Sequence, residues 1–112
     1  MSQLTTHILD TTRGKPAQGI PIVLYQQKEN EWVEKAKGIT NAEGRIVDFL
    51  KKDVVLEFGI YKLKFSTGEY FGILSIETFY PYIEIVFEIT TNSHYHVPLL
   101  LNPFGFSTYR GS

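Results

Sequence analysis

Three histidines are the residues best suited to chemistry in this chain. His7, His94 and His96 are its only histidines. Imidazole changes its protonation near neutral pH, so it serves as a general acid, a general base or a metal ligand. His94 and His96 lie two residues apart in an expected strand, which places their side chains on one face. For each histidine taken singly, the pattern favours the alternative of a solvated strand residue without a catalytic task.

The histidine pair has an apolar face opposite it. Tyr95, Val97, Leu99 and Leu101 alternate with the histidines and are apolar enough to form part of a core. The histidine side should therefore point toward solvent, a partner chain or a site. A His-x-His pair on a strand could also place two metal ligands, but the spacing supplies no third ligand, so no metal site is predicted.

One arginine and the polar tail complete the candidate chemistry. Arg45 directly follows Gly44, and its planar guanidinium could bind a carboxylate, an enolate or a urate-like anion. The alternative is an ordinary surface charge at a turn. The tail over residues 107–112 follows the apolar segment 104–106, so we expect it to be held in place, where its last residues could line a site or form a plain edge strand.

Other familiar sites are not indicated. Glu84 and Glu88 alternate with Ile and Phe, which is typical of a solvated sheet face rather than of a pair of catalytic carboxylates. The glycines have the wrong spacing for a phosphate-binding loop, and no Gly-x-Ser-x-Gly motif occurs.

The segments that must position these residues are short strands. Aromatic residues make up 14% of the chain, and alternating segments are separated by turn residues. One helix is expected over Thr67–Leu74, with Thr67 as its cap and with Tyr70 and Phe71 facing inward. The pattern predicts an all-β sandwich or barrel whose topology stays open. The expected strands are Leu4–Asp10, Ile20–Tyr25, Trp32–Ile39, Ile60–Phe65, Ile83–Ile89, Tyr95–Leu101 and Phe104–Tyr109.

Composition limits the class of protein. A chain of 112 residues fits one domain over 1–112, and 43% hydrophobic residues exclude disorder as the main state. The net charge of −1 gives no basic field for nucleic acid or a membrane surface. With no cysteine, disulfides and thiol catalysis are excluded. No signal peptide or membrane-spanning run is visible, so a cytoplasmic location is expected unless a leader was removed.

Two stretches and the tail resemble a known family. His7-Ile8-Leu9-Asp10, with Gly14–Ala17 and Ile20–Ile22, resembles the N-terminal signature of the transthyretin family. Tyr95–Ser107 is similar to its C-terminal signature, although Asn102 stands where serine is more usual. The closing Tyr109-Arg110-Gly111-Ser112 is similar to the mark of the enzymatic branch, the 5-hydroxyisourate hydrolases, which the thyroid-hormone carriers lack.

The resemblance implies a fold, an assembly and a reaction. The fold would be a transthyretin-like, two-sheet antiparallel β-sandwich with one short helix. The chain would form a homotetramer, a dimer of dimers, with active sites in the channel between dimers. The reaction would be the hydrolysis of 5-hydroxyisourate to 2-oxo-4-hydroxy-4-carboxy-5-ureidoimidazoline in urate degradation, without metal or cofactor.

The resemblance also implies roles for particular residues. His7 and His96 would supply general acid and base catalysis, and Arg45 would hold the anionic ring and stabilise its oxyanion. His94 is not a functional position of the family and is taken as incidental. The substrate-binding residues would be His7, Arg45, Tyr109, Arg110 and Ser112.

Three other functions stay open. The first is a transthyretin-like carrier of an aromatic ligand, against which His96 and the tail argue. The second is a metal-dependent protein that uses His94 and His96 together with a residue of another subunit. The third is a purely structural β-sandwich, which would have no reason to hold this combination of His7, Arg45 and His96.

Overall fold

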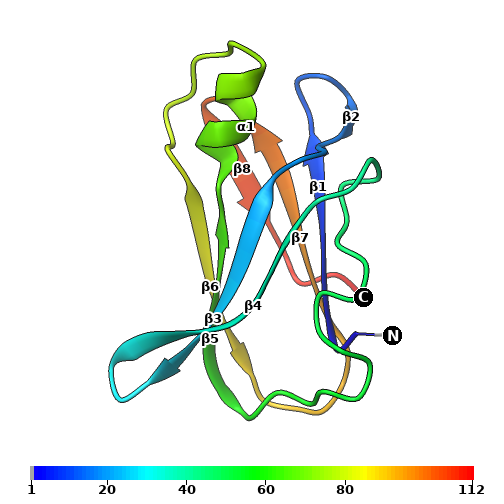
Figure 1. Ribbon diagram of the computed structural model, residues 1–112, viewed down its shortest axis with the longest axis vertical. Coiled ribbons are helices and arrows are strands. Elements are labelled where there is room, and N and C mark those ends of the chain that lie inside the picture. Colours follow the sequence, from blue (N-terminus) through cyan, green and yellow to red (C-terminus); the bar gives the residue numbers. More distant parts are fainter. Residues whose placement is uncertain (1) are drawn as a thin grey trace.

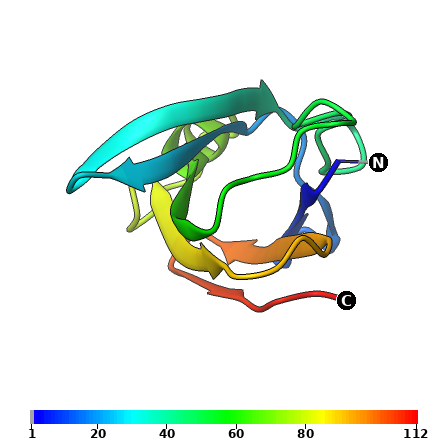
Figure 2. The same cartoon turned by 90° about the horizontal axis from the view of Figure 1, so that it is seen from below.

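The chain folds into two four-stranded sheets that pack face to face. The computed structural model describes residues 2–112. The first sheet has the order β2-β1-β7-β8, and the second has the order β4-β3-β5-β6 (Figure 1). Figure 2 shows the two layers from below, with β3 and β4 on one side and β7 and β8 on the other. These sheets confirm the predicted sandwich, although one pairing, β1 with β7, is parallel rather than antiparallel. The elements are β1 (Leu4–Asp10), β2 (Lys15–Pro16), β3 (Pro21–Lys28), β4 (Glu31–Ile39), β5 (Gly59–Phe65), α1 (Thr67–Ile73), β6 (Ile83–Ile89), β7 (Tyr95–Asn102) and β8 (Gly105–Thr108).

The core lies between the sheets and follows the alternation of the sequence. In β5, Tyr61, Leu63 and Phe65 are buried while Lys62 and Lys64 point outward, as the pattern predicts. Burying these side chains removes apolar surface from water at roughly 25 cal/mol per Å². The core draws on both sheets and α1, and its fully buried large side chains are Leu4, Ile8, Ile20, Ile22, Leu24, Tyr61, Leu63, Phe65, Phe71, Ile89, Leu99 and Leu101.

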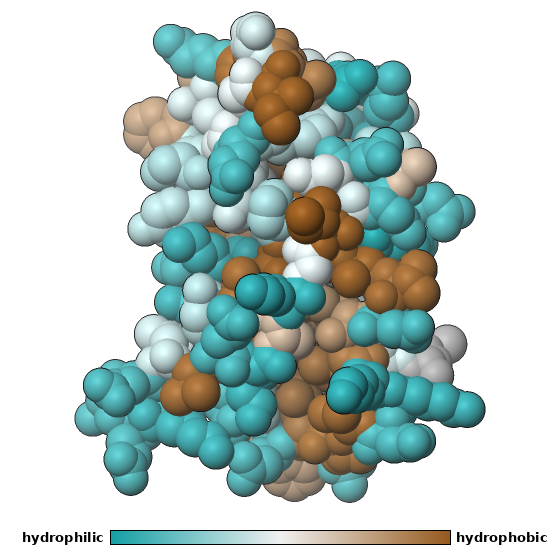
Figure 3. All heavy atoms as spheres, in the orientation of Figure 1, coloured by the Kyte–Doolittle hydropathy of each residue, from teal (hydrophilic) through white to brown (hydrophobic). Residues whose placement is uncertain are grey.

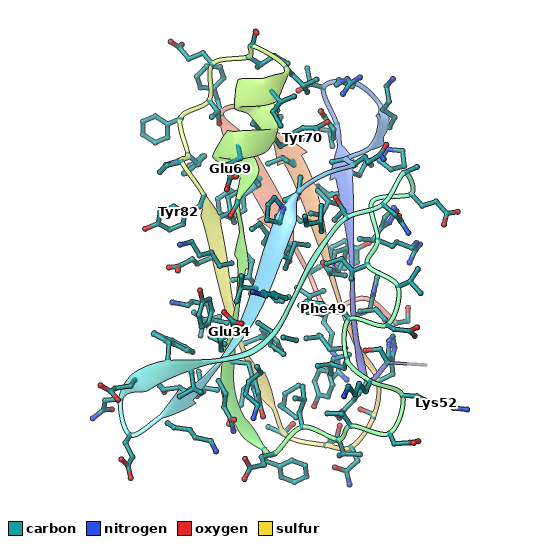
Figure 4. The ribbon with its side chains drawn as sticks, in the orientation of Figure 1. Glu34, Phe49, Lys52, Glu69, Tyr70 and Tyr82 are labelled. Atoms are coloured by element: carbon teal, nitrogen blue, oxygen red, sulfur yellow. The ribbon has the colours of Figure 1, made fainter. Side chains whose placement is uncertain are left out.

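The helix is present, but its predicted cap is wrong. Ser66 is the N-cap residue, and it makes no side-chain capping bond. Thr67 lies in the first turn with its side chain buried, because the helix packs over the end of the sandwich and turns this residue inward. Tyr70 and Phe71 are buried, as predicted. Figure 4 shows Tyr70 on α1, and its hydroxyl donates a 2.7 Å hydrogen bond to the buried Asp10 carboxylate.

One short strand was not predicted from the sequence. Lys15 and Pro16 form β2 and pair with Asp10 and Leu9 at the end of β1. Gly14, at φ +66°, makes the tight turn between the two strands. This hairpin leaves most of the outer edge of β1 open for another segment. Within residues 2–112, no helix is long and apolar enough to span a membrane.

One cation on the outer face of the second sheet is held by a carboxylate and two aromatic rings. The Lys62 ammonium lies 4.4 Å from the centre of the Trp32 ring and 5.2 Å from that of Tyr25, and it pairs with the Glu84 carboxylate at 3.1 Å. We call these four residues the paired face. Figure 3 looks onto the side of β3 and β4 and shows apolar side chains interspersed with hydrophilic ones.

Candidate active site

Parallel pairing of β1 with β7 brings the candidate histidines to one surface. Thr5 pairs with His96, and His7 pairs with Pro98 two residues further along both strands. Residues paired in this way share a face, and the core side chains of β7 occupy the opposite one. The expectation that the histidines point away from the core is therefore confirmed. We call Thr5, His7, His96 and the neighbouring Arg45 the histidine face.

The segment after β4 continues the sheet beside β1. Arg45 forms an isolated bridge with His7, and the backbone amide of Ile8 donates to the Gly44 carbonyl at 2.9 Å. The turn before it is fixed because the Asn41 side-chain oxygen accepts from the Arg45 amide at 3.1 Å. Local turn chemistry and one sheet contact together place the Arg45 backbone next to His7.

The tail continues the sheet beside β7 in the same way. Gly111 forms an isolated bridge with His96, and its amide donates to the His96 carbonyl at 2.8 Å. The expectation that the tail is held in place is confirmed. Ser112 follows directly and is brought to the side of His96.

Each of the two histidines packs against a glycine. A Cβ atom added at Gly44 would lie 3.3 Å from His7 Cδ2 and 2.5 Å from the Ile8 carbonyl oxygen. A Cβ atom at Gly111 would lie 2.5 Å from His96 Cδ2. Gly44 also has a φ of +75°, which favours glycine. The two glycines therefore allow backbone to approach both imidazoles closely and limit where those rings can lie.

An open cavity of about 350 Å³ collects several of the predicted site residues. It is lined by Thr5, Arg45, His94, His96 and Ser112. His7 is not among the lining residues but adjoins the cavity through its bridge to Arg45. The structure therefore gathers Arg45, His96 and Ser112 around one cavity and places His7 beside it.

Tyr109 and Arg110 face a different cavity. They line a space of about 270 Å³ between the tail, β6 and β7, together with Phe87 and Tyr95. The Arg110 guanidinium lies 4.2 Å from the centre of the Tyr95 ring. Within one chain these two residues do not meet His96 in its cavity, and their role in substrate binding stays a prediction.

Both half-buried imidazoles are biased toward the neutral form. Burial lowers the pKa of His96 from 6.5, and the nearby Arg45, His94 and His7 lower this pKa further, against an opposing effect of the Thr5 backbone. Burial and Arg45 likewise lower the pKa of His7 from 6.5, against an opposing effect of Glu43. At neutral pH the resting state of each imidazole is therefore uncharged, and an uncharged imidazole can accept a proton.

Two residues that line the cavity have no assigned role in the predicted site. The Thr5 hydroxyl lies 2.8 Å from His96 Nδ1 and 3.0 Å from His94 Nε2. The His94 and His96 rings stack with centroids 6.4 Å apart. His94 had been set aside as incidental, although its spacing from His96 was a usable signal. No signal pointed to Thr5, because its contact depends on the pairing of strands 91 residues apart.

Residues 2–112 do not by themselves provide the complete ligand set that a metal-dependent protein would need. Within residues 2–112, no group of three or more histidine, aspartate and glutamate side chains is placed to hold a metal ion. The His94 Nε2 and His96 Nδ1 atoms are both directed at the Thr5 hydroxyl. The alternative takes a further ligand from another subunit, so it stays a prediction.

Comparisons with known proteins agree on one family. The model of the HIUase/Transthyretin family matches residues 4–111 of this chain. The 5-hydroxyisourate hydrolase of Salmonella typhimurium is 46% identical over 110 residues, which cover 97% of this chain and 80% of that protein.

Two solved structures superpose over nearly the whole chain. The 5-hydroxyisourate hydrolase of Klebsiella pneumoniae has a TM-score of 0.81 at 39% identity and covers 97% of this chain and 92% of its own. Sea bream transthyretin in complex with thyroxine has a TM-score of 0.92 at 28% identity and covers 98% of this chain and 95% of its own. The backbone is thus similar to that of a transthyretin in complex with thyroxine, while sequence identity is higher with the hydrolases.

Proposed function

We propose that this chain, which belongs to the HIUase/Transthyretin family, catalyses the hydrolysis of 5-hydroxyisourate. The product is 2-oxo-4-hydroxy-4-carboxy-5-ureidoimidazoline, a step of urate degradation. The observation that carries the proposal is the cavity that brings His96, Arg45 and Ser112 together with His7 beside it. A carrier of the same backbone would need no such set of proton-transfer groups.

The chemistry requires two proton transfers that two imidazoles can perform. A general base removes a proton from water, and the oxygen attacks the carbonyl carbon of the cyclic amide. The tetrahedral oxyanion collapses, the C–N bond breaks, and a general acid protonates the departing nitrogen. The ring opens to a carboxylic acid and a ureido group, with one water consumed. His7 and His96 are the proposed base and acid, and their lowered pKa values support the uncharged form that a base needs.

Arg45 is the proposed anion-binding group. Its side chain lines the cavity, and among residues 2–112 it forms no ion pair with a carboxylate. A guanidinium with free donors can bind the anionic purine-like ring and stabilise the charge that develops on the attacked carbonyl oxygen. Ser112 is proposed to contact the substrate from the tail.

We further propose that the protein is a homotetramer, a dimer of dimers, as its family membership suggests. The histidine face is uncovered in the single chain, and its cavity is open. A second copy facing it would exclude water from the substrate, which strengthens electrostatic interactions. Tyr109 and Arg110 lie away from this cavity in one chain, so their proposed substrate contacts require a neighbouring copy or a movement of the tail.

The experiment is the decay of freshly generated 5-hydroxyisourate, followed by ultraviolet absorbance. Wild type and His96→Ala are compared with the spontaneous reaction, and circular dichroism verifies the fold of both. We expect wild type to accelerate the decay and His96→Ala to lose about 10²- to 10⁴-fold in kcat. Near-normal turnover by the variant would remove His96 from the mechanism. No acceleration by folded wild type would favour the carrier of an aromatic ligand.

A further inference from the structure

We infer that Thr5 and His94 are positioning residues that set which nitrogen of His96 carries the proton. This inference deepens the proposed function and rests on it for its catalytic consequence. The geometry that carries it is the Thr5 hydroxyl, held between His96 Nδ1 at 2.8 Å and His94 Nε2 at 3.0 Å. The hydroxyl reaches no other side chain or carbonyl within residues 2–112.

A hydroxyl has a single proton, so it can donate to only one of these two nitrogens. If Thr5 donates to His94 Nε2, it accepts from His96 Nδ1, and His96 then presents a bare Nε2 lone pair. If Thr5 donates to His96 Nδ1 instead, the proton of a neutral His96 is on Nε2. The bare Nε2 belongs to a general base, and the protonated Nε2 belongs to a general acid.

His94 decides between the two arrangements. A His94 ring with a bare Nε2 accepts the Thr5 proton and favours the base form of His96. A His94 ring protonated at Nε2 donates to Thr5 and turns the Thr5 proton toward His96. The basic side chains near the pair are His7, Arg45 and, on the other side of His94, Lys52.

The same three groups can carry away a proton and leave His96 neutral with its proton on Nε2, which is the acid form. When His96 takes a proton from water on Nε2, its Nδ1 proton can pass to Thr5 while the Thr5 proton passes to His94 Nε2. No bond other than N–H and O–H changes, and the number of protons is conserved. His94 is exposed and can exchange the extra proton with solvent, whereas His96 is half-buried.

The matched variants separate the hydroxyl from the shape of the side chain. Thr5→Val keeps the volume and removes the hydroxyl, and Thr5→Ser restores it. His94→Phe keeps a ring to stack on His96 but removes the nitrogen, and His94→Gln offers an amide oxygen as acceptor. Asn92→Ala is the control, since Asn92 lies exposed in the same loop without a side-chain hydrogen bond among residues 2–112.

Long-range ¹H–¹⁵N NMR of the histidine rings, with kcat and KM measured on the same samples, tests the inference. We expect wild-type His96 to carry its proton on Nδ1, and Thr5→Val and His94→Phe to move it to Nε2. Their kcat should fall about tenfold, with KM changed less than about twofold, because a positioning group is lost. Thr5→Ser and His94→Gln should recover both the tautomer and kcat, and Asn92→Ala should match wild type.

The two proposals fail in different ways. An unchanged His96 tautomer in folded Thr5→Val and His94→Phe would overturn the positioning role, whatever their activity. The expected tautomer shifts in a protein that does not accelerate 5-hydroxyisourate decay would support the positioning role and remove the proposed function. A fall in kcat that Thr5→Ser does not recover would also count against the hydroxyl.

Discussion

The two outer faces of the sandwich differ in whether their cations have a carboxylate partner. On the paired face, the Lys62 ammonium contacts the Glu84 carboxylate at 3.1 Å and lies over the Trp32 ring. On the histidine face, Arg45 lies beside two imidazoles and forms no ion pair with a carboxylate among residues 2–112. Lys62 therefore has its partners within the chain, whereas Arg45 keeps its donors free for a bound anion.

The different surroundings of Lys62 and Arg45 distinguish a charged residue that stabilises the fold from one that is available to a ligand. Strands of both sheets alternate in the same way, so alternation alone distinguishes neither face. On the histidine face, the two imidazoles are half-buried and lie near Arg45, and both effects lower their pKa values. Clusters of perturbed groups at a cavity are typical of functional sites, whereas neutralised pairs are typical of solvated surfaces.

Among the variants that test this contrast between the two faces, the largest effect is expected for Arg45→Gln. The amide keeps much of the length but loses the charge and the forked donors, so kcat/KM for 5-hydroxyisourate should fall about 10²- to 10³-fold. Lys37→Gln, at an exposed cation of β4, is the control and should leave kcat/KM unchanged. If both variants retained activity, the contrast between the two faces would have no catalytic meaning.

A smaller loss is expected when a methyl group is added beside His96. In Gly111→Ala the new Cβ would lie 2.5 Å from His96 Cδ2, so the ring or the tail must move. We expect kcat to fall about ten- to a hundredfold because the imidazole is displaced from its working position.

Gly105→Ala is the matched control for this change. Its Cβ would meet only the Asn102 side chain at 3.7 Å, which is ordinary contact, so its kcat should stay near that of wild type. A normal kcat in Gly111→Ala would mean that the tail does not limit the position of His96.

Much of this contrast could be predicted from the sequence. The alternation in Tyr95–Leu101 placed His96 on the side away from the core, and the family resemblance named His7, Arg45 and Ser112. The short β2 was not predicted because a strand of two residues is too short to show the alternation of apolar and polar residues. The Thr67 cap was wrong because packing of α1 over the core decided where the helix begins.

What could not be predicted depends on pairing between distant strands. Thr5 becomes relevant only when β1 lies parallel to β7 in the observed register, and short-range pattern does not encode that register. The same holds for Gly44 and Gly111, whose contacts with the imidazoles arise where two irregular segments extend the sheet.

The pH dependence of the reaction gives a third test, with a moderate effect. A free enzyme that needs an uncharged imidazole loses kcat/KM as pH falls through the pKa of that imidazole. Because burial and Arg45 lower the pKa of both His7 and His96 from 6.5, the midpoint of this loss should lie below pH 6.5. In Arg45→Gln, the midpoint should move to higher pH, since one of the lowering causes is gone. A midpoint above pH 6.5 in wild type would contradict the electrostatic description of the histidine face.

The smallest effect on catalysis is expected on the paired face. Lys62→Met keeps an unbranched stem against the two rings but removes the ammonium, so kcat and KM should stay within about twofold of wild type. The free energy of unfolding, measured with urea, should fall by about 1 kcal/mol because a cation held over two rings and beside a carboxylate is lost. Lys28→Met is the control. The Lys28 ammonium and the Glu57 carboxylate lie 3.4 Å apart on side chains that are 50% and 70% exposed, so the free energy of unfolding should barely change. If Lys62→Met lowered kcat without lowering the free energy of unfolding, the paired face would contribute to catalysis. That result would contradict its assignment as a purely structural surface.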